Sequence, residues 1–182
     1  FDRTALKIRL KDIWCFVGTG ALSVSFFNYC YFKTITLTSL SVAAVLLYTA
    51  PAFVMVMSFF LFKEEMTKKK VAALVIAFMG CVLVSGVAGG GGTLNAKGLL
   101  VGLGAGFGYA LYSIFGRYAL QRGYNSMTIT FYTFVFATLA TVFMADVSSI
   151  INIVETGPGL SVYAAFMILV VTLFPYLCYT KG

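Results

Sequence analysis

Few side chains of this 182-residue chain could do chemistry, and most of those are weakly polar groups set in long apolar stretches. Tyrosine offers a flat apolar face and one hydroxyl group, which suits amino acids, nucleoside-like metabolites or organic cations. We expect such residues to gather into one aromatic, weakly polar pocket for a small molecule. For any single one the alternative is packing between helices or anchoring at an interface. The candidates are Asn28, Tyr29, Tyr48, Thr49, Tyr109, Tyr112 and Tyr176.

Two prolines inside apolar stretches, Pro51 and Pro175, join this candidate site. Proline has no N–H, so the carbonyl groups of Leu47 and Val171 lose their usual donors and each helix must bend or open locally. A freed carbonyl group in an apolar surrounding needs another donor, which the Thr49 hydroxyl, a neighbouring helix or cavity water could supply. The alternative is a packing kink without a functional role.

Two charged residues also call for an interpretation. Lys33, near the end of an apolar stretch, either extends to the outer membrane interface or faces a substrate, where it would favour anionic or zwitterionic solutes. Glu64 follows an apolar stretch and precedes Lys68, Lys69 and Lys70, so anchoring or ion pairing is the simpler role for it.

Enzyme chemistry is poorly provided for. The sequence has no histidine, no carboxylate lies inside an apolar stretch, and no serine or cysteine has a base nearby in the sequence. Acid–base catalysis and metal binding both need such groups. The four cysteines have the spacing of neither a zinc site nor a disulfide framework. We therefore expect no enzyme, no cofactor and no metal.

Six apolar stretches carry the candidate residues, each close to the roughly 20 residues that a helix needs to cross a bilayer. The composition agrees, with 60% hydrophobic and 10% charged residues and a mean hydropathy of +0.95. Continuous apolar runs favour helices over barrel strands. The predicted fold class is an all-α integral membrane protein, a polytopic helical bundle. The expected spans are Ile13–Ile35, Leu40–Phe62, Val71–Val87, Leu99–Leu120, Thr128–Val147 and Leu160–Tyr179.

The basic residues predict how the chain is oriented. With these spans, eleven of the thirteen lysines and arginines fall on one side of the membrane, and only Lys33 and Lys97 fall on the other. By the positive-inside rule the basic loops are cytoplasmic, which predicts a multi-pass protein of the cell (plasma) membrane. The net charge of +7 then reflects topology and contact with anionic lipid rather than nucleic-acid binding.

The fourth apolar stretch is rich in glycine. Gly98, Gly102 and Gly106 recur every four residues, and Gly104 and Gly108 lie on another face. This order does not match the G-x-G-x-x-G nucleotide loop. Glycines at four-residue spacing let helix backbones approach closely, so we predict close helix packing here. A surface that slides between conformations is the alternative.

The first and sixth stretches suggest an internal repeat. Four identical pairs align in one register: Leu22 with Leu169, Val24 with Val171, Phe27 with Phe174 and Tyr29 with Tyr176. Five spans separate the two copies, and an odd number places them in opposite orientations across the membrane. The pattern therefore predicts an inverted repeat.

The run from Asn28 to Ser85 resembles the EamA repeat of drug/metabolite transporters. The matching features are Tyr31-Phe32-Lys33 before a short hairpin, Leu-Tyr-Thr-Ala-Pro at 47–51, Phe62-Lys63-Glu64 at the end of the next helix, and Gly80 in the closing helix. The resemblance spans the whole chain and departs at Ala73, where the family has glycine. It implies two inverted five-helix repeats, so we expect helices three to eight of ten, with residues 1–92 ending the first repeat and 93–182 beginning the second.

The resemblance also implies a secondary transporter that moves a small metabolite, such as an amino acid, across the cytoplasmic membrane by alternating access. Its partners would be a small-molecule substrate and the lipid bilayer, with no nucleic acid, and assembly into a homo-oligomer stays open. The alternative is a non-transporting membrane interaction or scaffold subunit. Polar residues of a transporter should converge on one water-accessible cavity, whereas those of a scaffold should scatter or face its partners.

Overall fold

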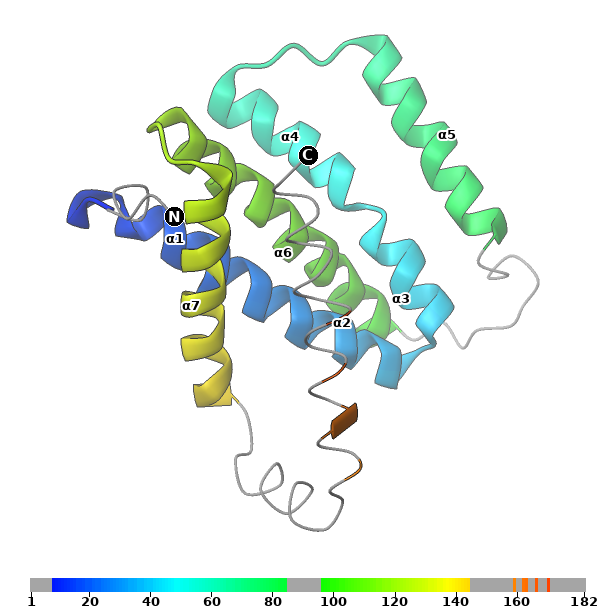
Figure 1. Ribbon diagram of the computed structural model, residues 1–182. Coiled ribbons are helices and arrows are strands. Elements are labelled where there is room, and N and C mark those ends of the chain that lie inside the picture. Colours follow the sequence, from blue (N-terminus) through cyan, green and yellow to red (C-terminus); the bar gives the residue numbers. More distant parts are fainter. Residues whose placement is uncertain are drawn as a thin grey trace. The chain divides into compact units, whose positions relative to one another are not determined.

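The computed structural model describes residues 8–84 and 96–144, together with Gly159, Val162, Tyr163, Phe166 and Val170. Within these residues every regular element is a helix (Figure 1). The chain divides into two compact units, residues 1–140 and 141–182, and the packing and the site described below belong to the first. Most of the sixth predicted span, with Pro175 and Tyr176, lies outside the described residues.

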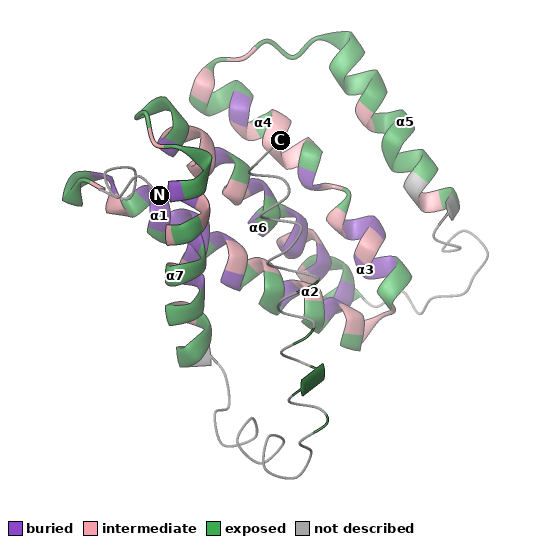
Figure 2. Cartoon of the chain, in the orientation of Figure 1, coloured by how far each residue is buried: buried purple, intermediate pink, exposed green. Residues whose placement is uncertain are grey.

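Four of the six predicted spans are confirmed as helices long and apolar enough to cross a membrane. They are Leu10–Leu37, Leu40–Phe62, Ala96–Gln121 and Ser126–Phe143. The third predicted span corresponds to α5 (Lys68–Val84), which at 17 residues is shorter than these four. In Figure 2, α5 is coloured as exposed along nearly its whole length, as expected for an apolar helix with few protein neighbours.

The first span is not a uniform α-helix. It begins with a short 3₁₀ turn, continues as a helix, widens into a π-helix and ends as a longer α-helix; these elements are η1 (Leu10–Asp12), α1 (Ile13–Val17), η2 (Gly18–Ser25) and α2 (Phe26–Leu37). The glycines, the threonine and the serines of η2 are buried, and the Ser23 hydroxyl donates to the Gly108 carbonyl oxygen at 2.7 Å. This wider stretch was not predicted, because its apolar pattern is that of an ordinary span.

The second span is broken in two, as the proline predicted. Helix α3 (Leu40–Leu47) ends before a turn at Tyr48 and Thr49, and α4 (Ala50–Phe62) begins with Pro51 in its first turn. A first-turn N–H has no intrahelical partner, so proline costs nothing there. The Thr49 hydroxyl does serve a carbonyl group at the break, although it donates to Leu46, at 2.6 Å, and not to Leu47.

Helix α6 (Ala96–Gln121) packs against α1, η2 and α2 and also against α3 and α4 (Figure 1). Its glycines form the two predicted faces. A Cβ atom on Gly102 or Gly106 would meet Leu46 or Thr49, whereas one on Gly108 would lie 2.9 Å from Phe26. The prediction of close packing through glycine is therefore confirmed on both faces.

Helix α7 (Ser126–Met144) crosses the first span where that span is π-helical. Gly20 lies so close to the backbone of Thr133 that a side chain would not fit. Beside this crossing the Thr133 hydroxyl donates to the Thr19 hydroxyl at 2.7 Å, and Thr19 in turn donates to the Phe16 carbonyl oxygen at 3.0 Å. A small residue and a buried chain of hydroxyl groups thus join these two spans.

Candidate functional site

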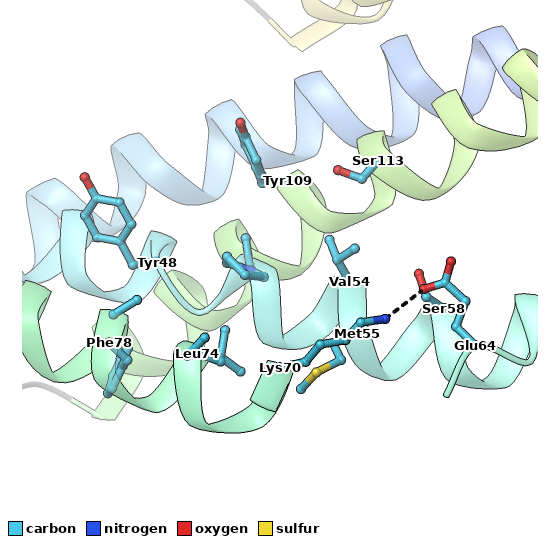
Figure 3. A pocket seen from close by; sticks show the side chains of 14 residues that line it. Tyr48, Val54, Met55, Ser58, Glu64, Lys70, Leu74, Phe78, Tyr109 and Ser113 are labelled. Atoms are coloured by element: carbon cyan, nitrogen blue, oxygen red, sulfur yellow. Dashed lines mark ion pairs between the residues drawn. The ribbon is translucent and has the colours of Figure 1, made fainter. Parts of the chain in front are cut away.

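A cavity of about 620 Å³ lies between α4, α5 and α6 (Figure 3). Most of its wall is apolar, with hydroxyl groups among the apolar side chains and a carboxylate and an ammonium group at one end. Figure 3 shows Tyr48 and Phe78 toward the opposite end from Glu64. The lining residues are Tyr48, Ala50, Pro51, Val54, Met55, Ser58, Glu64, Lys70, Ala73, Leu74, Ala77, Phe78, Tyr109 and Ser113.

Three of the predicted substrate-binding residues line this cavity, namely Tyr48, Pro51 and Tyr109. Tyr48 stands at the break between α3 and α4. Its side chain and that of Tyr109 are 54% and 49% exposed. Ser113, one turn after Tyr109 on α6, adds a further hydroxyl group. The lining thus combines aromatic rings with hydroxyl groups.

The structure does not bring the other candidates into this cavity. Asn28, Tyr29 and Lys33 are exposed on α2 and are not part of its lining. Thr49 is occupied by its bond to Leu46, and Tyr112 is half-buried on α6 outside the lining. Pro175 and Tyr176 lie outside the described residues.

Helix α5 supplies a wall that sequence reasoning missed. Ala73, Leu74, Ala77 and Phe78 line the cavity from this side. The signal was present in the two alanines four residues apart, which leave room along one helix face. Ala73, where the family has glycine, is one of these lining residues. A Cβ atom on Gly80 would meet no neighbouring group within 4 Å, so packing in the described structure does not require glycine there.

Glu64 closes the charged end of the cavity. Helix α4 ends at Phe62, and Lys63 adopts a left-handed conformation with φ 54°. The chain thus turns back, and the Glu64 N–H donates to the Ser58 carbonyl oxygen at 3.4 Å. The carboxylate accepts a hydrogen bond from Arg117 of α6 and lies 3.9 Å from Lys70 Nζ of α5.

The ion-pairing role expected for Glu64 is confirmed, but its main partner was not foreseen. The hydrogen bond from the Arg117 guanidinium holds the pKa of the Glu64 carboxyl below its usual range. Arg117 also stacks over the Phe62 ring, with its Cζ atom 4.2 Å from the ring centroid. Arg117 lies 53 residues from Glu64, and no local pattern indicates so distant a pair.

A second polar cluster lies at the start of the first span, away from the cavity lining. Asp12 is buried; it pairs with Arg122 Nε at 3.1 Å and accepts a hydrogen bond from the Tyr124 hydroxyl at 2.6 Å. Burial, and then this bond to a carboxylate, raise the pKa of Tyr124. The Arg122 guanidinium also lies over Trp14, 4.8 Å from its ring centroid. This cluster holds the segment between α6 and α7 to the first span.

Comparison with known proteins places the chain in a family. The model of the EamA-like transporter family matches residues 1–86 and again residues 96–182. An "Uncharacterized transporter" of Archaeoglobus fulgidus is 29% identical over 124 residues, which make up 68% of this chain and 43% of that protein. The chain thus spans less than half the length of this relative. No solved structure matches significantly. Since the family model covers nearly every residue, as the resemblance of residues 28–85 implied, the chain belongs to the EamA-like transporter family.

Proposed function

We propose that this chain forms part of a secondary transporter and that the cavity between α4, α5 and α6 binds a small metabolite. One observation carries the proposal: Tyr48, Pro51 and Tyr109 were singled out by residue type alone, and they line the same cavity although Tyr109 lies far along the chain from the other two. A scaffold has no need for its polar aromatic residues to converge. Concave, mostly apolar pockets with a few polar groups are typical of small-molecule sites.

The broken second span supports movement of substrate as well as binding. Irregular backbone at membrane depth is tolerated where it borders a cavity, and transporters commonly place substrate at such breaks. Here the break at Tyr48 and Thr49 adjoins the cavity, and the Thr49 hydroxyl satisfies one of the carbonyl groups that the break exposes. The helices on either side of the break can then change their angle without leaving that carbonyl group unpaired.

The proposed topology has two inverted repeats that alternate access to the cavity, with the basic loops in the cytoplasm. In its favour, the same family model matches on both sides of the proposed junction between residues 92 and 93. The ion pairs also favour the placement of the basic segments at one end of the helices. Arg117, near the end of α6, pairs with Glu64 in the loop after α4. Arg122, just after α6, pairs with Asp12 at the start of the first span. Three basic regions therefore gather at one end of the helices, as the positive-inside rule requires of cytoplasmic loops.

Transport by the full-length protein in proteoliposomes tests this proposal. A panel of amino acids, nucleosides and organic cations would be offered with and without a pH gradient. Tyr48→Ala and Tyr29→Ala form a matched pair, because the two side chains are 54% and 57% exposed and only Tyr48 lines the cavity. We expect the parent protein to show saturable uptake of at least one solute. The Tyr48→Ala protein should lose this uptake, and the Tyr29→Ala protein should keep it. Absence of uptake of every solute by folded protein would favour the scaffold alternative.

A further inference from the structure

Glu64 is connected to every wall of the cavity. It follows α4 in the chain, accepts a hydrogen bond from Arg117 of α6, and pairs with Lys70 of α5. Among the ion pairs of the described residues, Glu64 is the carboxylate with two cationic partners. Its position is set by the left-handed turn at Lys63, which brings the carboxylate back over the end of α4.

The two partners hold Glu64 unequally. Arg117 makes a direct hydrogen bond, and its guanidinium is fixed by stacking over Phe62, the last residue of α4. Lys70 Nζ is 3.9 Å away, beyond hydrogen-bond distance, and its side chain is 55% exposed. The contact between α4 and α6 is therefore firm at this end, whereas the contact with α5 is weak enough to separate.

Among the residues that the structure describes, little else holds α5 at this end of the cavity. Its residues from Lys68 to Ala73 are all exposed, and it joins α4 through the exposed residues 65–67. The cavity itself occupies the space between α5 and the other two walls (Figure 3). Movement of α5 away from α4 would separate Glu64 from Lys70 and leave the bond between Glu64 and Arg117 intact.

We infer that the pair of Glu64 and Lys70 is a closing contact at the charged end of the cavity, and that α5 is the wall that moves when this end opens. Glu64 acts as a positioning residue, held by Arg117 so that its second oxygen stays available to Lys70. This inference rests on the proposed function, because it assigns the contact to the site proposed to bind substrate. Figure 3 shows the contact between Lys70 of α5 and Glu64, two residues beyond the end of α4.

Labelling of a cysteine in the cavity tests the closing contact without any transport assay. Ser113→Cys, in full-length protein whose native cysteines are replaced by serine or alanine, would be exposed to a membrane-impermeant thiol reagent from the side of the basic loops. Lys70→Gln should raise the labelling rate about two- to fivefold. Loss of one exposed ion pair can increase the population of the open conformation by about this factor. Lys70→Arg, which keeps the charge, should label like the parent protein.

Lys69→Gln is the matched control, because Lys69 is an exposed neighbour on the same helix for which no ion pair is found in the described part of the chain. Glu64→Gln is the second variant and should raise labelling at least as much as Lys70→Gln. Equal labelling of the Lys70→Gln and Lys69→Gln proteins would overturn the inference, even if uptake assays succeed. If Lys70→Gln labels faster but the parent protein transports none of the solutes, the closing contact is supported. In that case only the proposed transport function is contradicted.

Discussion

Gly106 lies directly against Thr49, the residue at which the second span breaks into two helices. A Cβ atom on Gly106 would stand 2.5 Å from Thr49 Oγ1 and 3.1 Å from the Leu46 carbonyl oxygen. These are the two groups that the 2.6 Å hydrogen bond at the break joins. Glycine at position 106 therefore lets α6 approach the break beside which the cavity lies, and it leaves that hydrogen bond intact.

Replacing Gly106 by alanine should destabilise the protein. The added methyl group would push the Thr49 hydroxyl away from the Leu46 carbonyl group, and such overpacking costs about 1–3 kcal/mol. We expect a lower melting temperature in detergent. Gly116→Ala is the control on the same helix, because nothing lies within 4 Å of its Cβ position. That variant should be neutral or gain up to about 1 kcal/mol from helix propensity. Equal losses in both variants would contradict the packing described here.

Thr133→Val should weaken the crossing of α7 over the first span. Valine keeps the shape of threonine but removes the hydroxyl that donates to Thr19, where both side chains are buried. Hydrogen bonds of this kind between membrane helices contribute about 0.6–1.7 kcal/mol. Thermal unfolding of Thr133→Val against Thr130→Val measures the effect, since Thr130 is only half-buried on the same helix. A loss confined to the Thr130 variant would show that the crossing does not depend on this bond.

Tyr124→Phe should remove a contribution of about 1 kcal/mol, because the Tyr124 hydroxyl donates to the Asp12 carboxylate. The phenol has a raised pKa in the folded protein, so its contribution is fully present below the unfolded value of about 10 and is lost as pH rises through the folded pKa. The melting temperature should therefore fall above about pH 10 in the parent protein and fall less in Tyr124→Phe. An identical alkaline decline in both proteins would rule out this linkage.

Acid should weaken the contact between α4 and α6. The pKa of Glu64 is lowered by the hydrogen bond from Arg117, so the stability it contributes is present above the unfolded value of about 4.3 and is lost as pH falls through the folded pKa. We expect the melting temperature to drop in this acidic range, and to drop less in Glu64→Gln. Glu65→Gln, a change at the exposed neighbouring residue, serves as the control and should behave like the parent protein.

Features that depend on a residue and its immediate neighbours were predictable from the sequence. Four of the apolar stretches coincide with helices of membrane-spanning size. At most helix ends, the predicted and observed boundaries differ by no more than three residues. The missing N–H of Pro51 located the break in the second span, because proline cannot donate to the carbonyl group four residues earlier. The absence of a side chain at Gly102, Gly106 and Gly108 predicted close approach, because only backbone atoms limit the distance there.

Which of these residues meet was decided only by the tertiary structure. Tyr29 and Tyr48 are alike in sequence terms, yet only Tyr48 lines the cavity, because the direction in which a helix side chain points depends on how the helix is packed. The pairing of Glu64 with Arg117 likewise follows from α6 lying beside the end of α4. Local composition determines that a helix forms and where it bends. Long-range packing, which no short window of sequence contains, determines which polar groups share a site.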